Sequence, residues 1–334
     1  MTPGQNEHMR AVVLHSHGGP EVLTIEQTPD PDFGPDEVLV DVAATALNRA
    51  DLLQRMGAYP DPRGRVPEIP GLEFAGTVAA VGERVTMWRP GDRVMGIEAG
   101  GAHAERIATH ERQLLAVPAS LSLAEAAAVP EVFLTAWDAL VLQGGLTSGR
   151  WALVHAGASG VGTASIQIAK AIGARIAVTC SAGKAAVCRD LGADLVFERS
   201  PHDWLAEATA TVPGGFDVVL DVIGGDEVDR NLQSVAPRGT IVQVGLMGGG
   251  RTPVNVGLLL AKRCSWVGTT LRTRPIEEKV AVTRRFAAEM LPLFDTGALR
   301  PVIDSTFPFD RIADAHRHME ANANAGKIVV TVQP

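Results

Sequence analysis

The sequence of 334 residues is poor in cysteine and in aromatic residues. It has three cysteines, Cys180, Cys188 and Cys264, none in a C-x-x-C pair, and its 4% aromatic content includes a single tyrosine. This small, odd set of cysteines argues against a disulfide framework. Because no cysteine precedes Cys180, the first half of the chain has no thiolate for a structural zinc site.

The sequence also lacks any apolar run of the roughly 18 residues that a membrane span needs. Its first ten residues, MTPGQNEHMR, lack the apolar stretch of a secretory signal. These absences predict a cytosolic protein without a membrane partner. The net charge of −8 makes a nucleic-acid partner improbable. Five arginines near the C-terminal end are expected to form a solvated or anion-facing edge: Arg263, Arg272, Arg274, Arg284 and Arg285.

Glycine and proline are abundant instead, with 35 and 21 residues. The glycines follow no three-residue period, which excludes collagen. Val, Ile, Leu and Ala fill the intervals between them, which argues against low-complexity disorder. We therefore expect a folded chain, long enough for two domains, in which glycines serve particular backbone positions.

Two patterns divide the chain. Between Arg10 and about Pro118, short apolar strands alternate with Gly- and Pro-rich turns, which predicts a barrel-like β domain. From about residue 130 to 270, apolar strands alternate with amphipathic helices, which predicts a doubly wound parallel sheet. The C-terminal KIVVTVQP reads as a strand that joins the first domain. The expected division is a disordered extension at 1–8, a β domain at 9–130 with 300–334, and a doubly wound domain at 131–299.

Between these patterns, residues 122–145 carry helix formers at a spacing of 3.6 residues. Ser122 is placed as the N-cap of this predicted helix. Glu125, three residues on, predicts a capping box with it.

The turn after the apolar strand WALVH carries the pattern G-x-x-G-x-G. A glycine turn between a buried strand and a helix directs backbone N–H groups and the positive end of the helix dipole to one point, which suits a pyrophosphate. The alternative is an ordinary strand-to-helix turn with packing glycines. The context favours a dinucleotide loop made of Gly157, Ser159, Gly160, Val161 and Gly162.

The end of the next strand favours NADPH over NADH. An NAD site usually has Asp or Glu there to accept from the ribose 2′-OH, but this segment reads TCSAGK with no carboxylate before Asp190. Ser181 and Lys184 offer a donor and a positive charge for a 2′-phosphate. Arg199, at the end of the third strand, could add a second cation or stack on the adenine.

Several stretches resemble the medium-chain dehydrogenase/reductase superfamily, whose members join a GroES-like domain to a Rossmann domain. These are PGLEFAGTVAAVGERV, PGDRVMG, VHAGASGVG and DVIGG. Others resemble the zinc-independent quinone oxidoreductases, closest to the p53-inducible quinone oxidoreductase type: ALNRADLLQRMGAYP, AAAVPEVFLTAW, VGLMGGG and MEANANAGKIV. The likeness covers nearly everything from Met9 onwards. It implies an α/β protein with a GroES-like β-barrel domain and a Rossmann doubly wound parallel-sheet domain.

The same resemblance implies an enzyme without a metal. Zinc-dependent members hold their catalytic metal with a Cys near the position of Asn48 and with the His of a Gly-His-Glu motif. This sequence has Asn48 and Gly71-Leu72-Glu73, so both ligands are missing. Glu73 is expected to be a polar turn or supporting residue. Without a Lewis acid the acceptor must already be electrophilic, which suits a quinone.

Residue-by-residue matching to the family implies the remaining site residues. Asn48 and Tyr59 would flank the nicotinamide as the catalytic pair; the alternatives are that Asn48 bonds a strand end and that Tyr59 packs in a loop instead of donating a proton. Arg199 stands where the family commonly has Tyr. Further cofactor contacts are implied for Asn48, Thr135, Gly245, Leu246, Met247, Thr270, Leu271 and Lys327.

The resulting expectation is a metal-free, NADPH-dependent reduction of a quinone or another electrophilic carbonyl acceptor in a cleft between the domains. The segment CSWVGTTLRT is a plausible edge strand of the Rossmann sheet, which predicts a homodimer. One alternative is an enoyl or enone reductase in which Tyr59 protonates carbon. Another is an NADPH-binding, RNA-interacting protein without enzymatic activity that uses the arginines between Arg263 and Arg285.

Overall fold

In the computed structural model, residues 8–64, 67–199 and 203–333 are described, and the chain folds into two compact units. Residues 1–7 of the expected disordered extension lie outside the described residues, and His8 already belongs to the first strand. Unit 1 comprises Met1–Glu131, Arg272–Gly297 and Pro301–Pro334, and unit 2 comprises Val132–Leu271 and Ala298–Arg300.

This division differs from the expected one at residues 272–297, because the sequence pattern assigns them to the doubly wound domain. They group with unit 1 because helix α9 (Ile276–Glu289) is tied to it by side-chain contacts. Glu277 forms an ion pair with Arg112 at 2.5 Å. Arg284 donates a hydrogen bond to the carbonyl oxygen of Leu114.

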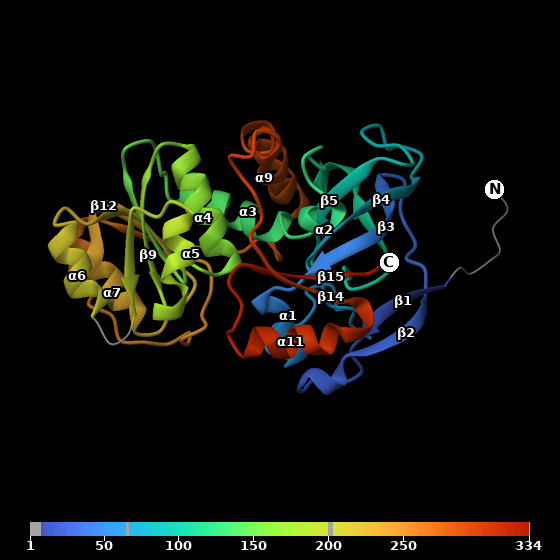
Figure 1. Ribbon diagram of the computed structural model, residues 1–334, viewed down its shortest axis with the longest axis horizontal. Coiled ribbons are helices and arrows are strands. Elements are labelled where there is room, and N and C mark those ends of the chain that lie inside the picture. Colours follow the sequence, from blue (N-terminus) through green and yellow to red (C-terminus); the bar gives the residue numbers. More distant parts are fainter. Residues whose placement is uncertain (1–7, 65–66, 200–202, 334) are drawn as a thin grey trace. The chain divides into compact units, whose positions relative to one another are not determined.

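Unit 1 is built on a seven-stranded sheet, shown with the other elements in Figure 1. The order of its strands is β14-β15-β3-β4-β5-β7, with β6 also pairing with β3, while β1 and β2 form a separate antiparallel pair. The strands are β1 (His8–Val13), β2 (Thr24–Pro29), β3 (Glu37–Ala46), β4 (Glu73–Val81), β5 (Arg93–Ile97), β6 (Arg106–His110), β7 (Leu114–Ala116), β14 (Ile303–Pro308) and β15 (Lys327–Thr331).

The core of unit 1 explains why the C-terminal strand joins this sheet. The side chains of Val38, Val40 and Val42 on β3 are fully buried, and they share one apolar cluster with Phe74 and Val330. β15 pairs antiparallel with β3 and parallel with β14. The prediction that KIVVTVQP completes the first domain's sheet is therefore confirmed.

The helices of unit 1 are short apart from α9 and α11. The Asn48 N–H at the start of α1 donates to Asp51 Oδ2 at 2.7 Å, which satisfies one of the N–H groups left free where a helix begins. The helices are α1 (Arg49–Arg55), α2 (Leu123–Ala126), α9, α10 (Pro292–Asp295) and α11 (Ile312–Glu320), with single turns at η1 (Pro20–Val22), η2 (Glu111–Gln113) and η5 (Phe309–Arg311).

The predicted helix at 122–145 is instead divided into three pieces. The capping box is confirmed, because the Glu125 N–H donates to Ser122 Oγ and the Ser122 N–H donates to Glu125 Oε2. The helix nevertheless stops after one turn, and Pro130, which cannot continue a helix from the preceding turn, opens the next one. The pieces are α2, α3 (Pro130–Trp137) and a π-helical segment η3 (Asp138–Gln143).

Unit 2 is the doubly wound parallel sheet that the strand and helix alternation predicted. Its strand order is β10-β9-β8-β11-β12-β13, and every neighbouring pair is parallel. The strands are β8 (Trp151–His155), β9 (Arg175–Cys180), β10 (Leu195–Glu198), β11 (Phe216–Asp221), β12 (Val235–Gln243) and β13 (Ser265–Gly268).

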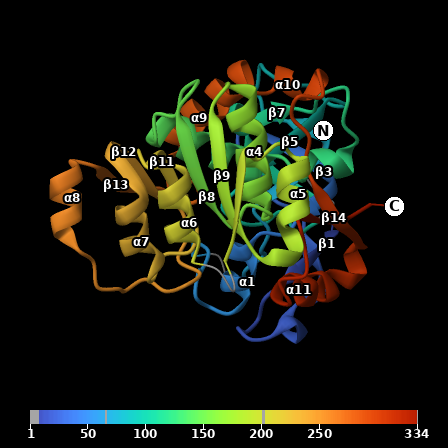
Figure 2. The same cartoon turned by 60° about the vertical axis from the view of Figure 1, so that its left-hand side comes forward.

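Helices cover both faces of this sheet, with α4 and α5 on one side and α6 and α7 on the other (Figures 1 and 2). They are α4 (Gly160–Ala171), α5 (Ala185–Asp190) after the turn η4 (Ala182–Lys184), α6 (Trp204–Thr211), α7 (Glu227–Ser234) and α8 (Val256–Lys262). β13 is an edge strand, as predicted, but with four residues it is shorter than CSWVGTTLRT. In the described part of the chain, no helix is long and apolar enough to cross a membrane.

Candidate functional site

The loop between β8 and α4 has a backbone that requires glycine at two positions. A Cβ atom on Gly157 would lie 2.5 Å from Val178 Cβ, and one on Gly162 would lie 2.4 Å from the carbonyl oxygen of Ala156. Ala156 itself has a left-handed φ of 55°. The first contact packs the loop on β9, and the second packs the start of α4 on the loop. The tight strand-to-helix turn that the sequence predicted is therefore present.

The N-terminus of α4 suits a phosphate group. The helix has 12 residues, and Ser159 is its N-cap, with its Oγ accepting from the Gly162 N–H at 3.1 Å. The Ser159 hydroxyl keeps its own hydrogen for another acceptor. The N–H groups of Gly160 and Val161 head the same helix, where its dipole favours an anion. These residues fit the pyrophosphate of a dinucleotide.

The residues expected near the 2′-phosphate follow the next two strands. Ser181 comes directly after β9 and is exposed, and Lys184 lies one turn further along and is half-buried. Arg199 follows β10, which pairs with β9, and its guanidinium lies 3.9 Å from Glu227 Oε1. The end of β9 and the turn after it, residues 179–184, contain no carboxylate where an NAD site usually has one.

A buried polar chain holds the turn after β11 in place. His155 bonds Thr179 Oγ1 at 2.9 Å and Asn231 Oδ1 at 2.7 Å through its two ring nitrogens. Asn231 Nδ2 donates to Asp221 Oδ2 at 2.9 Å, and Asp221 Oδ1 accepts from the Ile223 N–H at 2.6 Å. Four elements are thereby linked at the carboxyl edge of the sheet. Sequence reasoning missed this chain, because its members are far apart in the sequence.

The loops after β12 and β13 contribute the remaining expected residues of unit 2. Gly245 packs so closely on β11's outgoing loop that a Cβ would lie 2.8 Å from the Val222 carbonyl oxygen. Leu246 and Met247 are exposed, Thr270 is exposed, and Leu271 is half-buried. Thr135 is buried on α3. Within unit 2, the expected phosphate, 2′-phosphate and ribose residues thus follow carboxyl ends of parallel strands, where ligands bind in open α/β sheets.

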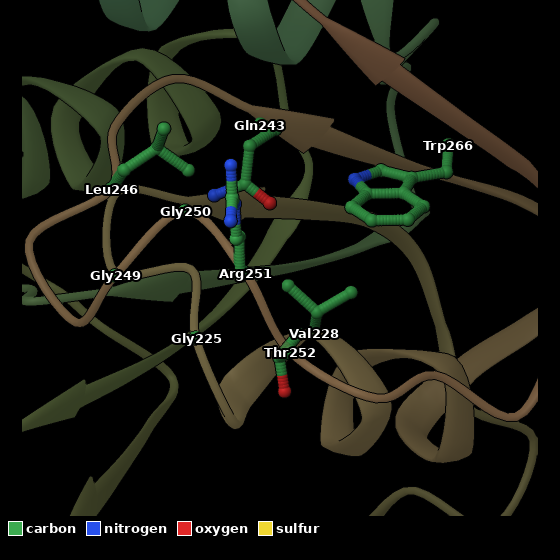
Figure 3. A pocket seen from close by; sticks show the side chains of 9 residues that line it. All are labelled: Gly225, Val228, Gln243, Leu246, Gly249, Gly250, Arg251, Thr252 and Trp266. Carbon is green, nitrogen blue, oxygen red and sulfur yellow. The ribbon is translucent and has the colours of Figure 1, made fainter.

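A pocket of about 260 Å³ opens beside the β12 loop. Figure 3 shows the Trp266 ring and the Leu246 side chain on opposite sides of it. Gln243 lines the pocket, and its side chain is held in place because Nε2 donates to the carbonyl oxygens of Asp221 and Gly245. The pocket therefore borders the loop expected to meet the nicotinamide ribose.

In unit 1, a buried ammonium lies between two of the residues singled out from sequence. Lys327 Nζ donates to Asn48 Oδ1 at 2.6 Å and to the Leu47 carbonyl oxygen at 2.6 Å, and it lies 2.6 Å from Glu73 Oε1. Asn48 Nδ2 in turn donates to Glu73 Oε1 at 2.9 Å. Asn48, Glu73 and Lys327 are each less than a tenth exposed. We call these three residues the Lys327 cluster.

The Lys327 cluster changes the expectation for its members. All three N–H groups of Lys327 are engaged within unit 1. The cofactor contact that the resemblance implied for Lys327 stays a prediction. Both polar atoms of the Asn48 amide, Oδ1 and Nδ2, form hydrogen bonds within the cluster. Glu73 is part of a buried ion pair and is more than a polar turn residue; burial raises its pKa, and Lys327 opposes that rise. A sequence signal for this pairing was absent, because 254 residues separate Glu73 from Lys327.

Two more titratable side chains are buried next to the cluster. Asp51 accepts from the N–H groups of Asn48 and Gly71, yet burial raises its pKa to about 6. Burial and the Lys327 charge lower the pKa of His103 to about 3, so its ring is neutral. Among the described residues, no group of three or more His, Cys, Asp or Glu side chains is arranged to hold a metal ion.

Tyr59 is held by Arg272. The Arg272 guanidinium stacks over the Tyr59 ring at 4.5 Å from its centroid and donates to the Tyr59 carbonyl oxygen at 2.8 Å. It also donates to Gln54 Oε1 and the Ala99 carbonyl oxygen. The prediction that Arg272 belongs to a solvated basic edge is wrong, because it is only 6% exposed and satisfies polar groups inside unit 1.

These features define a two-unit protein with a dinucleotide-binding parallel sheet in one unit and a buried ionic cluster in the other. Residues 34–139 match the alcohol dehydrogenase GroES-like domain, and residues 191–330 match the family described as zinc-binding dehydrogenase. The chain belongs to the medium-chain dehydrogenase/reductase superfamily of oxidoreductases, a family that binds a nicotinamide cofactor. The predicted fold class is confirmed.

Its relatives and structural neighbours span more than one activity. The synaptic vesicle membrane protein VAT-1 homolog of Rattus norvegicus is 31% identical over 98% of this chain and 85% of its own length. The 2-methylene-furan-3-one reductase of Solanum lycopersicum is 31% identical over 96% of this chain and 79% of its own.

The solved structures that match include a quinone oxidoreductase and an enoyl reductase. A quinone oxidoreductase from Pseudomonas syringae matches with a TM-score of 0.88 and 31% identity, covering 97% of this chain and all of its own. The JamJ enoyl reductase matches with a TM-score of 0.88 and 26% identity, covering 98% of this chain and all of its own.

The buried ion pair gives a direct stability prediction. Lys327→Met leaves the Glu73 carboxylate buried without its counter-ion, which should lower the free energy of unfolding by about 3–5 kcal/mol. The double variant Lys327→Met with Glu73→Gln removes both charges and should recover part of that loss. Urea unfolding measures all three proteins.

Lys170→Met is the matched control, because it removes a lysine from the exposed ion pair with Asp194 and should cost no more than about 1 kcal/mol. A Lys327→Met protein as stable as Lys170→Met would contradict the importance of the cluster.

Proposed function

We propose that this protein is an NADPH-dependent oxidoreductase that reduces quinones without a metal ion. The observation that carries the proposal is the Lys327 ammonium, which bonds Asn48 and Glu73 in unit 1. Asn48 stands where zinc-dependent members have a ligand, and here it is bonded to a fixed cation supplied by the chain. An acceptor that needs no Lewis acid suits such a site.

The cofactor proposal rests on the strand ends of unit 2. Gly157, Ser159, Gly160, Val161 and Gly162 would hold the pyrophosphate. Ser181, Lys184 and Arg199 would take the 2′-phosphate; Thr135, Gly245, Leu246, Met247, Thr270 and Leu271 would meet the nicotinamide half. When bound, the reduced nicotinamide supplies a hydride, and the protein orients it and excludes water.

The catalytic proposal concerns unit 1. Asn48 and Tyr59 remain the proposed catalytic pair, with Lys327 orienting the Asn48 amide. The Arg272 contacts hold the Tyr59 backbone and ring in one place. We also propose that the protein is of the p53-inducible quinone oxidoreductase type. Unit 1 would then be its GroES-like catalytic domain.

Reduction of an enoyl or enone substrate is the second candidate. The likeness to the JamJ enoyl reductase and to the tomato 2-methylene-furan-3-one reductase favours it. An RNA-binding role has less support, because Arg272 and Arg284 donate to carbonyl oxygens inside unit 1.

The proposed assembly is a homodimer through β13. This strand is an edge of the parallel sheet, and Trp266 on it is 43% exposed. Helix α8, which directly precedes β13 in the sequence, adds two exposed apolar side chains, Val256 and Leu260. The cytosolic location expected from the sequence remains a prediction.

Replacing Ser181 tests the cofactor preference. Ser181→Asp adds a carboxylate that repels a 2′-phosphate and accepts from a 2′-OH, so it should weaken NADPH binding about tenfold or more and strengthen NADH binding. Titration of protein fluorescence with each cofactor measures both constants. Ala206→Glu adds one negative charge to an exposed position of α6 and should change neither constant; comparable NADPH affinity in Ser181→Asp and wild type would refute the assignment.

Acceptor turnover tests the reaction. Steady-state oxidation of NADPH should show a kcat/KM about tenfold or more higher for a quinone than for an enoyl thioester, because the quinone needs no proton at carbon. The reverse order would favour the enoyl reductase. Tight NADPH binding without turnover of any acceptor would favour a non-enzymatic role.

A further inference from the structure

Glu131 is a half-buried acid that sequence reasoning did not single out. It lies in the first turn of α3, directly after Pro130, and its backbone N–H donates to Glu73 Oε2 at 2.8 Å. This bond fixes the start of α3 against the Lys327 cluster. Within the described part of the chain, no hydrogen bond to the Glu131 carboxyl group is found, so its acidic hydrogen is not committed to a protein acceptor.

The charges around Glu131 come from several other elements. Glu73 on β4 and Asp51 on α1 repel a negative charge there, while Lys327 on β15 and Arg272 attract it. Lys279 on α9 also interacts with it electrostatically. Burial is the largest effect, followed by the Glu73 charge, and together they raise the pKa of Glu131 to about 8. The carboxyl group is therefore mostly protonated at neutral pH.

The neighbouring groups cannot deliver a proton as readily. The three N–H groups of Lys327 are engaged with Leu47, Asn48 and Glu73. Asp51, with a pKa of about 6, is mostly ionised at neutral pH and accepts two backbone hydrogen bonds. The His103 ring is neutral and fully buried. Glu131 combines a retained proton with partial exposure.

The helix places Glu131 beside a residue already proposed to meet the nicotinamide. Thr135 follows it by four positions on α3. Residues four apart on an α-helix lie on the same face, one turn from each other. An acceptor held against the nicotinamide at Thr135 would thus lie near the turn that carries Glu131.

We propose that Glu131 is a catalytic proton donor, which passes its carboxyl proton to the acceptor oxygen that becomes negative during reduction. The assignment rests on the proposed function, in which the reduced nicotinamide supplies both electrons. The O–H bond of Glu131 breaks, and a new O–H bond forms on the hydroquinone or enol oxygen. The carboxylate left behind, next to Glu73 and Asp51, regains its proton from water.

Glu131→Gln tests this role, because glutamine keeps the shape of the side chain and carries no acidic proton. We expect kcat to fall about 100-fold with an enone, and less with a quinone, whose reduced oxygen is less basic. The wild-type rate should decline as pH rises through the pKa of about 8, and this decline should be absent in Glu131→Gln. NADPH affinity and unfolding by urea should match those of the wild type.

An infrared measurement reads the proton without turnover. The wild type should show the C=O stretch of a carboxylic acid at neutral pH, lost above the pKa of about 8 and missing in Glu131→Gln. Glu207→Gln, exposed on α6, is the matched control and should behave as wild type in every assay.

Turnover in Glu131→Gln within twofold of Glu207→Gln would overturn the assignment, as would a wild-type rate that is unchanged across this pH range. A wild type inactive with every quinone and enone would overturn the proposed function and the catalytic role of Glu131 together. Activity in the wild type with an unaffected Glu131→Gln would overturn the role of Glu131 alone.

Discussion

The ion pair between Lys327 and Glu73 is the interaction on which unit 1 depends. Either charge alone in this buried position would cost several kcal/mol, so each requires the other. Lys327 begins β15 and Glu73 begins β4, the strands on either side of β3. The pair therefore joins the C-terminal strand to the sheet, orients Asn48 at the start of α1, and gives the Glu131 N–H its acceptor.

The architecture of unit 2 depends on a different constraint, which is the parallel arrangement of its six strands. Parallel strands present all their carboxyl ends at one edge, and the loops there carry the residues that we propose to bind the dinucleotide. Close packing at Gly157 holds the loop against β9, and close packing at Gly162 holds the start of α4 against the loop. The chain from His155 through Asn231 to Asp221 holds the neighbouring turn. Unit 2 thus presents its strand ends at one edge, and unit 1 holds several charged groups around Glu131.

Local patterns in the sequence predicted much of this. The strand and helix alternation predicted the parallel sheet, the Ser122–Glu125 spacing predicted the capping box, and the glycine spacing predicted the tight turn between β8 and α4. Contacts between distant residues were not predictable from one sequence. The sequence around Lys327 does not indicate that this residue pairs with Glu73. The sequence around Arg272 does not indicate that it donates to Gln54 and to the Ala99 carbonyl oxygen. The raised pKa of Glu131 arises only when folding buries this side chain and gathers Glu73 and Asp51 around it.

We propose that the Lys327 ammonium takes the place of a metal ion at Asn48. Dialysis against a strong chelator, followed by metal analysis and assay of NADPH oxidation with a quinone, tests it most directly. We predict that the dialysed protein holds no stoichiometric zinc and keeps its full turnover, with no gain when zinc is returned. Loss of turnover on chelation, restored by one equivalent of zinc, would contradict the account.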